Sequence, residues 1–550
     1  MQEKQKKRTR ASHPKVRTGC HTCKARRVKC DEKRPACLKC VHTGRKCEGY
    51  QDNREWVVIV APPPPVTDGF DDDRSRRHFD YFRSQAVYEI SWFFDGNVWG
   101  PLVLKEAHAS AAVRHAVIAL SCSHEDFGDS LTHADQSPQF AYAAQHYSKA
   151  MRNLIKETSD NTSESRMRAL ICGLLFIAIE VLRGNNVAAR HHLNACLKIV
   201  KEAQEKMGTQ YVQNSPHPLE KDRLEVETHL TEGIIPMFAR LDIQGQLILG
   251  GTPQTEMTPI VWSPSSRMRI EKPPLRFESV IPACNSILLM SNDLHSFMMQ
   301  YSDIYRVQCV RPIPVEVTAQ KVSLYKQFSE WDYAVRPMIK TITRQRDRDK
   351  ITLMRVYNRT AITLLENSLD IEECYMDNFH WVFRELMDFV AELRERPYNS
   401  DEESDSDTSV TSLTSVNSDA LSFDRWTRPF FALDHCIIFA LYWTALKCRD
   451  GALRRRAIPL LEISRQEGIW SGPISAAIAK RVIELEEGEP YRQYPPAGQL
   501  KRAKDIPEYV RIHSVRTDID KLRRQAKLVI MRRPNGDEGG WHESVEWVSW

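Results

Sequence analysis

The chain of 550 residues has no hydrophobic run long enough to cross a membrane. A membrane-spanning helix needs roughly 20 consecutive apolar residues, and the longest apolar segments, Ala169–Ile179 and Cys436–Leu446, are far shorter. The first residues are basic and polar, without the apolar stretch of a secretory signal. We therefore expect a soluble intracellular protein with no membrane partner, and we interpret both apolar segments as buried core helices.

The short motifs that mark common enzyme classes are also missing. The sequence has no Gly-x-x-x-x-Gly-Lys phosphate loop, no Gly-x-Gly-x-x-Gly loop, no His-Glu-x-x-His motif and no Gly-x-Ser-x-Gly motif. His191 and His192 are adjacent, so on a helix they point about 100° apart and do not hold one metal ion together. We therefore expect a binding protein and not an enzyme.

Charge is distributed unevenly, although the net charge is only +5. Residues 1–50 carry 16 Lys and Arg against 4 Asp and Glu, a net of +12, so the other 500 residues have a net charge of −7. A basic head on a mildly acidic body predicts a polyanionic partner for the head.

Six of the fourteen cysteines lie close together near the N-terminus, and the other eight are scattered singly in apolar surroundings, where we expect small core residues. The clustered six form two near-identical halves of one pattern, Cys20-x2-Cys23-x6-Cys30 and Cys37-x2-Cys40-x6-Cys47. A disulfide framework would need an oxidising compartment, which the missing signal disfavours. The Cys-x2-Cys spacing lets two sulfurs bind one ion, and zinc takes four sulfurs in a tetrahedron.

Six sulfurs can serve two zinc ions only if two of the sulfurs bridge both ions. A segment this short has almost no apolar core, so we expect the metal to supply its folding energy, on the order of 10–16 kcal/mol per structural zinc site. His21 and His42 lie within the pattern, and we expect them to be surface side chains because six thiolates already suffice.

Four cations stand in the run Lys24-Ala25-Arg26-Arg27-Val28-Lys29, between the second and third cysteines. An arginine fork can donate two hydrogen bonds to guanine O6 and N7, and lysine binds phosphate as a point charge. This pattern predicts a DNA-binding protein. The alternative is a zinc-stapled protein-interaction adaptor, without base-specific DNA binding, whose cations face an acidic protein surface.

The segment Gly19–Tyr50 resembles the fungal Zn₂Cys₆ binuclear-cluster DNA-binding domain in its six cysteines, its basic run and Pro35. The resemblance implies one zinc ion on Cys20, Cys23, Cys30 and Cys37 and a second on Cys20, Cys37, Cys40 and Cys47. It implies base contacts, typically to a CGG triplet in the major groove of double-stranded DNA, from Arg26 and Arg27, although many members have Lys at the latter position. It implies phosphate contacts from Lys24, Lys29, Lys39 and Lys46.

The same resemblance implies a nuclear transcription regulator of RNA polymerase II genes that works with the transcription machinery. The expected domains are a basic arm at 1–18, the zinc cluster at 19–50, a proline-rich and acidic linker at 51–75, and a helical regulatory domain at 76–550. No heptad repeat follows Cys47. The protein therefore binds either as a monomer or as a homodimer through residues 76–550. We expect Trp56–Val60 to form a strand on the body.

Residues 76–550 show apolar side chains at helical spacing, so the expected fold is a small metal-stapled domain with two short helices followed by a large, mainly α-helical domain. The segments that start at Ala143 and Ala188 resemble each other at an offset of 45, which fits either a helical repeat or two similar helices. Helices are predicted over Phe430–Lys447 and Ser475–Glu487.

Two segments depart from this helical pattern. Ser400–Ser422 has 8 Ser, 3 Thr and 6 Asp or Glu, which predicts a disordered acidic insertion over 398–424. The acids that flank Ser404 and Ser406 predict phosphorylation there, and the alternative is an acidic activation segment. Near the C-terminus, Ala526–Met531 is β-prone, Pro534–Asp537 is a turn signal and Trp541–Trp550 alternates. These features predict a C-terminal β-hairpin.

Overall fold

The computed structural model describes residues 18–50, 69–91, 98–129, 138–160, 162–210, parts of 233–242, 273–395, and 431–550 apart from 434–436, 464–465, 469, 497, 521–522 and 536–538. The chain divides between Asp68 and Gly69 into two compact units, which we call the cysteine module (residues 18–50) and the body (residues 69–550). The predictions for residues 1–17, Trp56–Val60 and the acidic insertion 398–424 lie outside the described residues.

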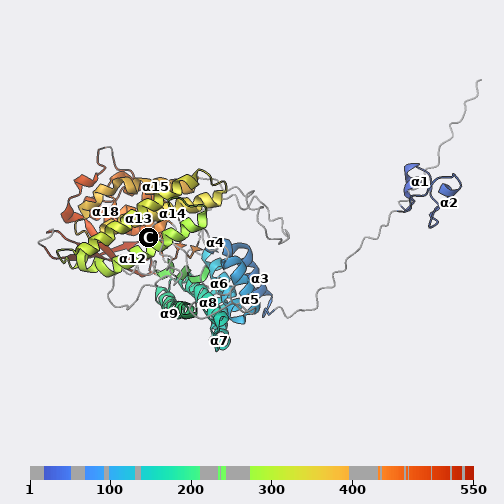
Figure 1. Cartoon of the computed structure of the whole chain (residues 1–550), viewed down its shortest axis with the longest axis horizontal. Helices are drawn as coiled ribbons and strands as arrows, with labels where there is room; N and C mark the ends of the chain where they lie inside the picture. Colours follow the sequence, from blue (N-terminus) through green and yellow to red (C-terminus); the bar gives the residue numbers. More distant parts are fainter. Residues whose placement is uncertain are drawn as a thin grey trace, which may run out of the picture. The chain divides into compact units, whose positions relative to one another are not determined.

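The cysteine module contains two very short helices, α1 (His21–Ala25) and α2 (Leu38–Val41) (Figure 1). Each helix starts directly after a cysteine whose sulfur caps it. The Sγ of Cys20 accepts a hydrogen bond from the N–H of Cys23 at 3.4 Å, and the Sγ of Cys37 accepts one from the N–H of Cys40 at 3.3 Å. The cysteine spacing therefore sets where both helices begin, because the cap satisfies a backbone donor that has no partner within the helix.

The body starts with a helical half, residues 69–242, whose buried side chains form one core. Its elements are α3 (Asp73–Tyr81), η1 (Phe82–Ala86), α4 (Val87–Ser91), η2 (Val98–Leu102), α5 (Val103–Ala109), α6 (Ala111–Asp129), α7 (Pro138–Glu157), α8 (Ser163–Leu182) and α9 (Asn186–Gln210). In α8 every residue of 170–182 is buried, which confirms the prediction of a core helix there.

No described helix of the chain is long and apolar enough to span a bilayer.

Helices α7 and α9, which carry the two similar segments, both contact α8. The ring of Phe176 on α8 lies 4.7 Å from the ring of Tyr147 on α7 and 5.4 Å from the ring of His192 on α9, measured between centroids. The hydroxyl of Tyr147 and Nε2 of His192 are 2.7 Å apart. The repeat itself stays a prediction.

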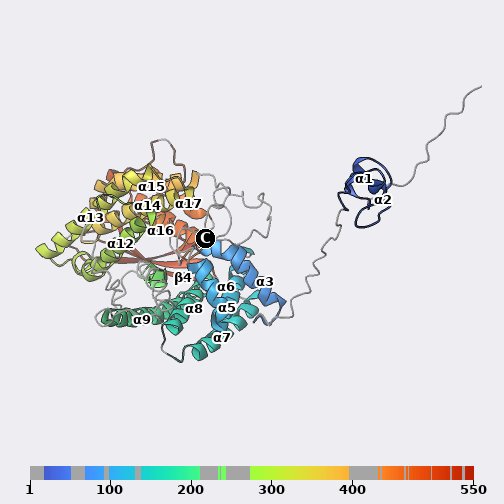
Figure 2. The same ribbon diagram turned by 45° about the vertical axis from the view of Figure 1, so that its right-hand side comes forward.

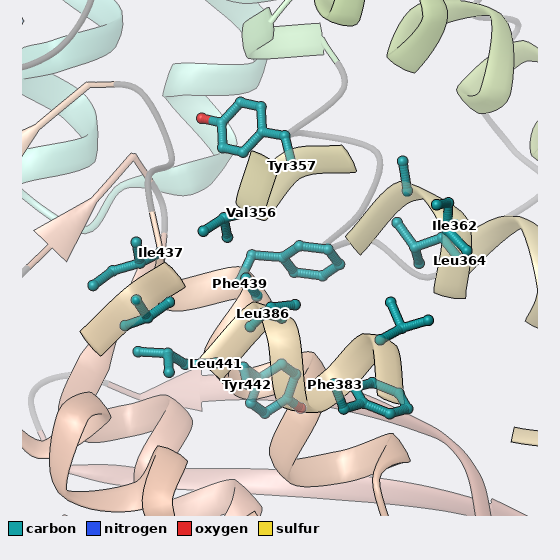
Figure 3. Packing of buried hydrophobic residues seen from close by; sticks show 14 of the residues in the cluster. Val356, Tyr357, Ile362, Leu364, Phe383, Leu386, Ile437, Phe439, Leu441 and Tyr442 are labelled. Atoms are coloured by element: carbon teal, nitrogen blue, oxygen red, sulfur yellow. The ribbon is translucent and has the colours of Figure 1, made fainter. Parts of the chain in front are cut away.

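The second half of the body, residues 273–550, has its own core, and Figures 1 and 2 show the two halves side by side. Its helices are α12 (Val280–Ser302), η6 (Asp303–Val307), α13 (Val315–Ile339), α14 (Gln345–Asn367), η7 (Glu373–Phe379), α15 (His380–Glu395), α16 (Ile438–Lys447), α17 (Gly451–Glu462), α18 (Gly472–Glu487), η10 (Ala503–Asp505) and η11 (Glu508–Val510). Figure 3 shows how this core is filled by side chains of α14, α15 and α16, among them Tyr357, Phe383 and Leu441.

The predicted helix over Phe430–Lys447 is wrong in its first part. Residues Phe431–Ala432 form strand β1, which pairs in parallel with β2 (Gln466–Glu467), and β2 pairs with β3 (Trp470–Ser471) in antiparallel. The side chain of Phe431 is buried in the core of the first half. Helix α16 begins only at Ile438, where the carboxylate of Glu467 accepts the N–H groups of Ile437 and Ile438, each at 2.8 Å. The predicted helix over Ser475–Glu487 is confirmed as part of α18.

The C-terminus is a three-stranded antiparallel sheet in the order β4 (Ile512–Asp520), β5 (Gln525–Arg532), β6 (His542–Ser549). The predicted hairpin is confirmed as β5 and β6, with Val529 opposite Val545. Strand β4 was not predicted. Its sequence interrupts the apolar alternation with charged residues, and a register irregularity lies between Ile512 and Ser514.

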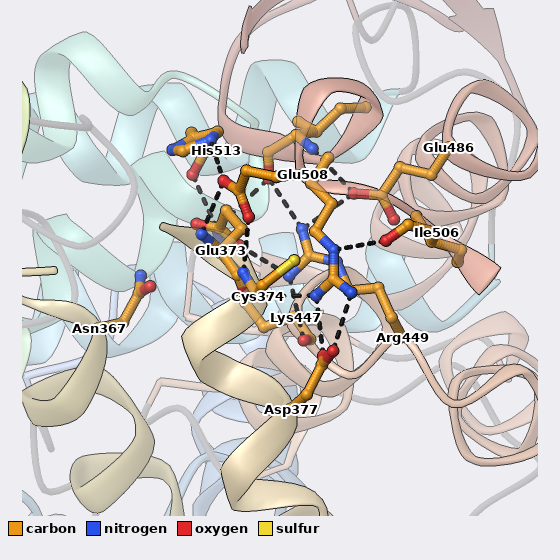
Figure 4. A network of polar contacts seen from close by, with 12 residues as sticks. Asn367, Glu373, Cys374, Asp377, Lys447, Arg449, Glu486, Ile506, Glu508 and His513 are labelled. Atoms are coloured by element: carbon orange, nitrogen blue, oxygen red, sulfur yellow. Dashed lines mark hydrogen bonds and ion pairs between the residues drawn. The ribbon is translucent and has the colours of Figure 1, made fainter. Parts of the chain in front are cut away.

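A buried ionic network holds this sheet against the helices (Figure 4). Glu373 is fully buried, and its carboxylate contacts Lys447 at 2.6 Å and Arg449 at 2.7 Å. Although burial opposes its charge, these cations and Arg306 hold the pKa of Glu373 well below its usual range. The ammonium of Lys447 also donates to the carbonyl of His513 on β4 at 2.7 Å. A buried charge needs such partners to be tolerated.

The scattered cysteines of the body are free thiols among the described residues. Five are buried, as predicted, and they are Cys122, Cys172, Cys196, Cys284 and Cys448. Cys309 and Cys374 are half-buried. Cys436 lies outside the described residues.

Candidate metal centre and nucleic-acid interface

The six clustered cysteines form two groups of four that share two members. The ligand atoms of Cys20, Cys23, Cys30 and Cys37 lie within 4.8 Å of one another, and so do those of Cys20, Cys37, Cys40 and Cys47. The Sγ of Cys37 lies 3.6 Å from the sulfurs of Cys20 and Cys23. A disulfide has its sulfurs about 2.05 Å apart, so the disulfide alternative does not describe this cluster, and all six thiols are free.

These sulfur spacings fit zinc. In a tetrahedral site with Zn–S bonds of about 2.3 Å, neighbouring sulfurs are about 3.8 Å apart. Within one group the Sγ of Cys40 lies 3.8 Å from that of Cys20, and within the other the Sγ of Cys23 lies 3.6 Å from that of Cys37. The donor set is purely thiol, which is the chemistry that structural zinc sites use. The six clustered cysteines therefore make this module a zinc-binding domain.

The surroundings of the sulfurs differ between the centre and the edge of the cluster. Burial raises the pKa of Cys20 to about 12 and also raises the pKa values of Cys23 and Cys37. At Cys30 burial is outweighed by backbone N–H donors and the hydroxyl of Tyr50, which lower its pKa to about 7. Backbone hydrogen bonds also lower the pKa of Cys47. The central sulfurs therefore need a cation beside them to become thiolates, and a divalent metal provides it.

The module has an internal pseudo-symmetry at an offset of 17 residues, which relates Cys20 to Cys37. In both halves the backbone turns through the left-handed region four residues after the second cysteine of the pattern, with φ 55° at Arg27 and φ 67° at Gly44. Glycine adopts this conformation without penalty, whereas another residue pays about 1–2 kcal/mol. The first half therefore retains an arginine at a position where glycine is the unstrained choice.

The two adjacent arginines lie in different environments. Arg27 is exposed to solvent, whereas Arg26 is half-buried. The Nη1 of Arg26 donates to the hydroxyl oxygen of Thr43 at 3.2 Å, and that hydroxyl donates to the carbonyl of Lys39 at 2.8 Å. Arg26 is thus anchored on the second half of the module, and Arg27 projects without such an anchor in the described contacts.

The remaining predicted contact residues all present their side chains to solvent. Lys24, Lys29, Lys39 and Lys46 are exposed, as are His21 and His42. No described metal-ligand group includes either histidine. Among the described residues, the module therefore offers a cationic surface that surrounds a buried sulfur cluster.

Sequence reasoning missed the residues that support this arrangement. Asp31 caps α2, with its carboxylate accepting the N–H groups of Leu38 at 3.1 Å and Lys39 at 3.2 Å. The hydroxyl of Tyr50 donates to the carbonyl of Lys33 at 2.6 Å. An acid seven residues before a helix gives no periodic signal, because the contact depends on the path of the intervening loop.

Comparison with protein families gives two matches. The fungal Zn(2)-Cys(6) binuclear cluster domain matches residues 18–56, and the fungal specific transcription factor domain matches residues 77–395, which is more than half of the chain. The first match covers all six cysteines of the cluster.

Curated relatives agree with these families. The transcription regulator lscL of Purpureocillium lilacinum is 31% identical over 202 residues, covering 32% of this chain and 47% of the relative. The aspercryptin biosynthesis cluster-specific transcription regulator atnN of Emericella nidulans is 29% identical over 216 residues, 34% of this chain and 35% of the relative. The transcriptional regulatory protein moc3 of Schizosaccharomyces pombe is 54% identical over 52 residues, 9% of this chain and 10% of the relative.

The matches thus span less than half the length of each of these relatives. No solved structure matches the chain significantly. The large family match covers helices on both sides of the division between the two cores of the body. With the zinc-binding module at its N-terminus and this domain in its body, the chain belongs to the family of fungal specific transcription factors with a Zn(2)-Cys(6) cluster.

Proposed function

We propose that this chain is a sequence-specific DNA-binding regulator of RNA polymerase II genes that acts in the nucleus. The observation that supports this most is the exposed Arg27, kept at φ 55° on a cysteine cluster where the equivalent position of the second half is Gly44. Strained backbone conformations cluster at functional sites, and here the strained residue carries an exposed cation on the cysteine cluster. Family membership and the names of the relatives point the same way.

Two zinc ions complete the module in this proposal. One is held by Cys20, Cys23, Cys30 and Cys37, and the other by Cys20, Cys37, Cys40 and Cys47. Bound zinc would supply the positive charge that stabilises the central thiolates and the crosslinks that replace an apolar core. The module's own residues then present α1 and its basic end to the DNA.

Arg26 and Arg27 contact bases in the major groove in this proposal, with a CGG-like triplet as the preferred site. An arginine that donates two hydrogen bonds to guanine contributes about 1–3 kcal/mol of discrimination. Arg26 is anchored on Thr43 and so has a fixed position on the module. The phosphate contacts come from Lys24, Lys29, Lys39 and Lys46, and they fix the register without carrying sequence information.

The other parts of the chain have separate roles. Residues 1–18 are a basic arm, 51–75 a linker and 76–550 a regulatory domain with an acidic insertion at 398–424. The regulatory domain forms the homodimer contact and engages the transcription machinery. This assignment rests on the absence of a heptad repeat after Cys47, which leaves the body as the part that sets half-site spacing.

Selection from a random duplex pool, with the full-length zinc-loaded chain at near-physiological salt, tests the proposal. We expect enrichment of CGG-like triplets. Two triplets at fixed spacing would support the homodimer, and a single triplet would replace it by a monomer. If no sequence is enriched while the zinc content is intact, the DNA-binding proposal fails and the adaptor alternative takes its place.

A variant pair sharpens this test. Arg27→Ala should lose most of the preference for the selected triplet over a scrambled duplex. Arg45→Ala is the matched control, because Arg45 is an exposed cation of the same module outside the proposed contacts. It should leave the ratio of the affinities for the two duplexes unchanged. An Arg27→Ala chain that discriminates as well as the parent chain would overturn the assignment of Arg27.

A further inference from the structure

Apart from the cysteine groups, the described residues contain one more set of side chains arranged to hold a metal ion. It consists of Asp71, His115 and His146, whose ligand atoms all lie within 4.8 Å of one another. Asp71 lies just before α3, His115 is on α6 and His146 is on α7. Three separate segments of the body therefore bring one carboxylate and two imidazoles together.

The two imidazole rings face each other with their Nδ1 atoms. The Nδ1 atoms of His115 and His146 are 3.1 Å apart. Two nitrogens bound to one zinc ion at about 2.0–2.1 Å are separated by roughly 3.0–3.4 Å, depending on the coordination angle. A single hydrogen bond between neutral imidazoles would give a similar spacing, so the distance alone does not distinguish the two cases. A hydrogen-bonded pair of histidines does not need a carboxylate beside it, so the third donor, Asp71, favours a metal site.

The surroundings hold these donors in place and leave one side open. His146 is 1% exposed and His115 is 8% exposed, whereas the side chain of Asp71 is 41% exposed. The ring of Tyr142 lies 4.6 Å from the ring of His146, and its hydroxyl donates to the carboxylate of Asp72 at 2.8 Å. An ion could reach the two buried nitrogens from the side of Asp71.

Burial keeps the two histidine rings neutral, so that each has a nitrogen lone pair for a cation. Burial, followed by the neighbouring His115 and Lys149, lowers the pKa of His146 to about 4, against the opposing influence of Asp71 and Asp72. Burial also lowers the pKa of His115. Both rings are therefore neutral near pH 7, and a neutral imidazole has a lone pair for a metal.

One charge opposes a bound cation. Lys149 lies one turn after His146, and its ammonium contacts Oδ2 of Asp71 at 2.5 Å. A metal ion would have to share the Asp71 carboxylate with this lysine, which reduces its affinity through like-charge repulsion. Ligating carboxylates commonly accept a second contact of this kind.

We propose that Asp71, His115 and His146 form a metal site in the body for a first-row divalent transition-metal ion, with zinc as the physiological candidate. Two imidazoles and a carboxylate suit this class of ion, and the absence of thiolate ligands makes the site weaker and more exchangeable than the cysteine cluster. The remaining coordination positions belong to solvent. Occupancy would connect the start of the body at Asp71 to α6 and α7.

Cobalt titration of the full-length chain with zinc in its cysteine cluster tests this site. Co²⁺ bound by nitrogen and oxygen gives visible d–d bands without the near-ultraviolet charge-transfer band of cobalt thiolates. We expect such a spectrum to saturate at about one ion per chain, and added Zn²⁺ to abolish it by competition. A spectrum with thiolate bands only, or no spectrum, would overturn the proposal.

Two substitutions outside the core, at the exposed Asp71 and the half-buried Lys149, test the site. Asp71→Asn should weaken cobalt binding by at least about tenfold, and Lys149→Met should strengthen it because the competing cation is gone. Asp73→Asn is the matched control, since its carboxylate is almost fully exposed and contacts Arg76. Equal cobalt affinity in the Asp71→Asn and Asp73→Asn chains, or no gain from Lys149→Met, would overturn the assignment. Unchanged thermal unfolding of each variant shows that the fold is retained.

Discussion

The two halves of the cysteine module share one scaffold but not one surface. Both have the same cysteine spacing, a helix capped by its first cysteine, and a left-handed residue at the equivalent position. Between the second and third cysteines, however, the first half has four cations, and the second half has only Arg45 and Lys46. The first half also carries Arg27 where the second has Gly44.

This difference separates what the metal requires from what a partner requires. The shared features position sulfur atoms, and they recur because both four-sulfur groups have the same geometry. The features that differ all concern side chains at the surface. The second half supports the first through Thr43, which anchors Arg26. We infer that the first half carries base recognition, and the second half mainly holds it in position and adds phosphate contacts.

The largest effect should come from the sulfurs that the halves share. Cys37 belongs to both four-sulfur groups, whereas Cys47 belongs to one. Cys37→Ser should therefore lose both zinc ions and unfold the module, because structural zinc contributes on the order of 10–16 kcal/mol. Cys47→Ser should retain one ion in part. Zinc content per chain, measured after dialysis, checks this.

The control for that experiment is Cys374→Ser, which removes a half-buried free thiol of the body and should leave the zinc content unchanged. Equal zinc loss from Cys37→Ser and Cys47→Ser would mean that the two sites do not share ligands as proposed. Chelation of the parent chain should remove the module's DNA binding and leave the helical signal of the body in circular dichroism nearly unchanged.

The second-largest effect should come from exchanging the residues at the two positions with left-handed backbone, Arg27 and Gly44. Arg27→Gly should cost about 1–3 kcal/mol of base discrimination, yet relieve about 1–2 kcal/mol of backbone strain, so the module should release zinc less readily. Gly44→Arg should add strain of that size without a clash, because a Cβ at Gly44 meets no atom within 4 Å. Competition binding with matched and scrambled duplexes, and zinc release to a chelator, measure the two quantities separately.

Two outcomes would contradict the proposed difference between the halves. If Arg27→Gly keeps its preference for the selected triplet, the strain at this position does not serve base recognition. If Gly44→Arg acquires a new base preference, the second half is also a recognition surface.

The ease of prediction differs between the two units for a physical reason. In the module, the short cysteine spacings set where both helices begin, whereas the division of the six sulfurs into two groups came from the family resemblance. In the body, helices and the β5–β6 hairpin follow from periodicity, but the start of α16 does not. It depends on Glu467, thirty residues downstream, whose carboxylate caps the helix. The same holds for Glu373, whose partners Lys447 and Arg449 are more than seventy residues away.

A smaller effect should follow from removing the hydrogen bond between Arg26 and Thr43. Thr43→Val removes the hydroxyl that accepts from Arg26 and donates to the carbonyl of Lys39. One lost hydrogen bond costs about 0.5–1.5 kcal/mol, so affinity for the selected triplet should fall up to about tenfold. Thr43→Ser keeps the hydroxyl and should bind like the parent chain. Equal affinities of the Val and Ser variants, by fluorescence anisotropy, would show that the anchor does not matter.

The smallest effect, and the most direct comparison of the halves, concerns Lys29 and Lys46. Each is exposed and directly precedes the last cysteine of its half. If both contact phosphates, Lys29→Gln and Lys46→Gln should each lower the slope of log affinity against log salt by about one, with no change in base preference. Lys33→Gln, at an exposed position outside this pair, should leave the slope unchanged. A change at Lys29 alone would mean that DNA contacts only the first half, so that the pseudo-symmetry serves the metal and not the nucleic acid.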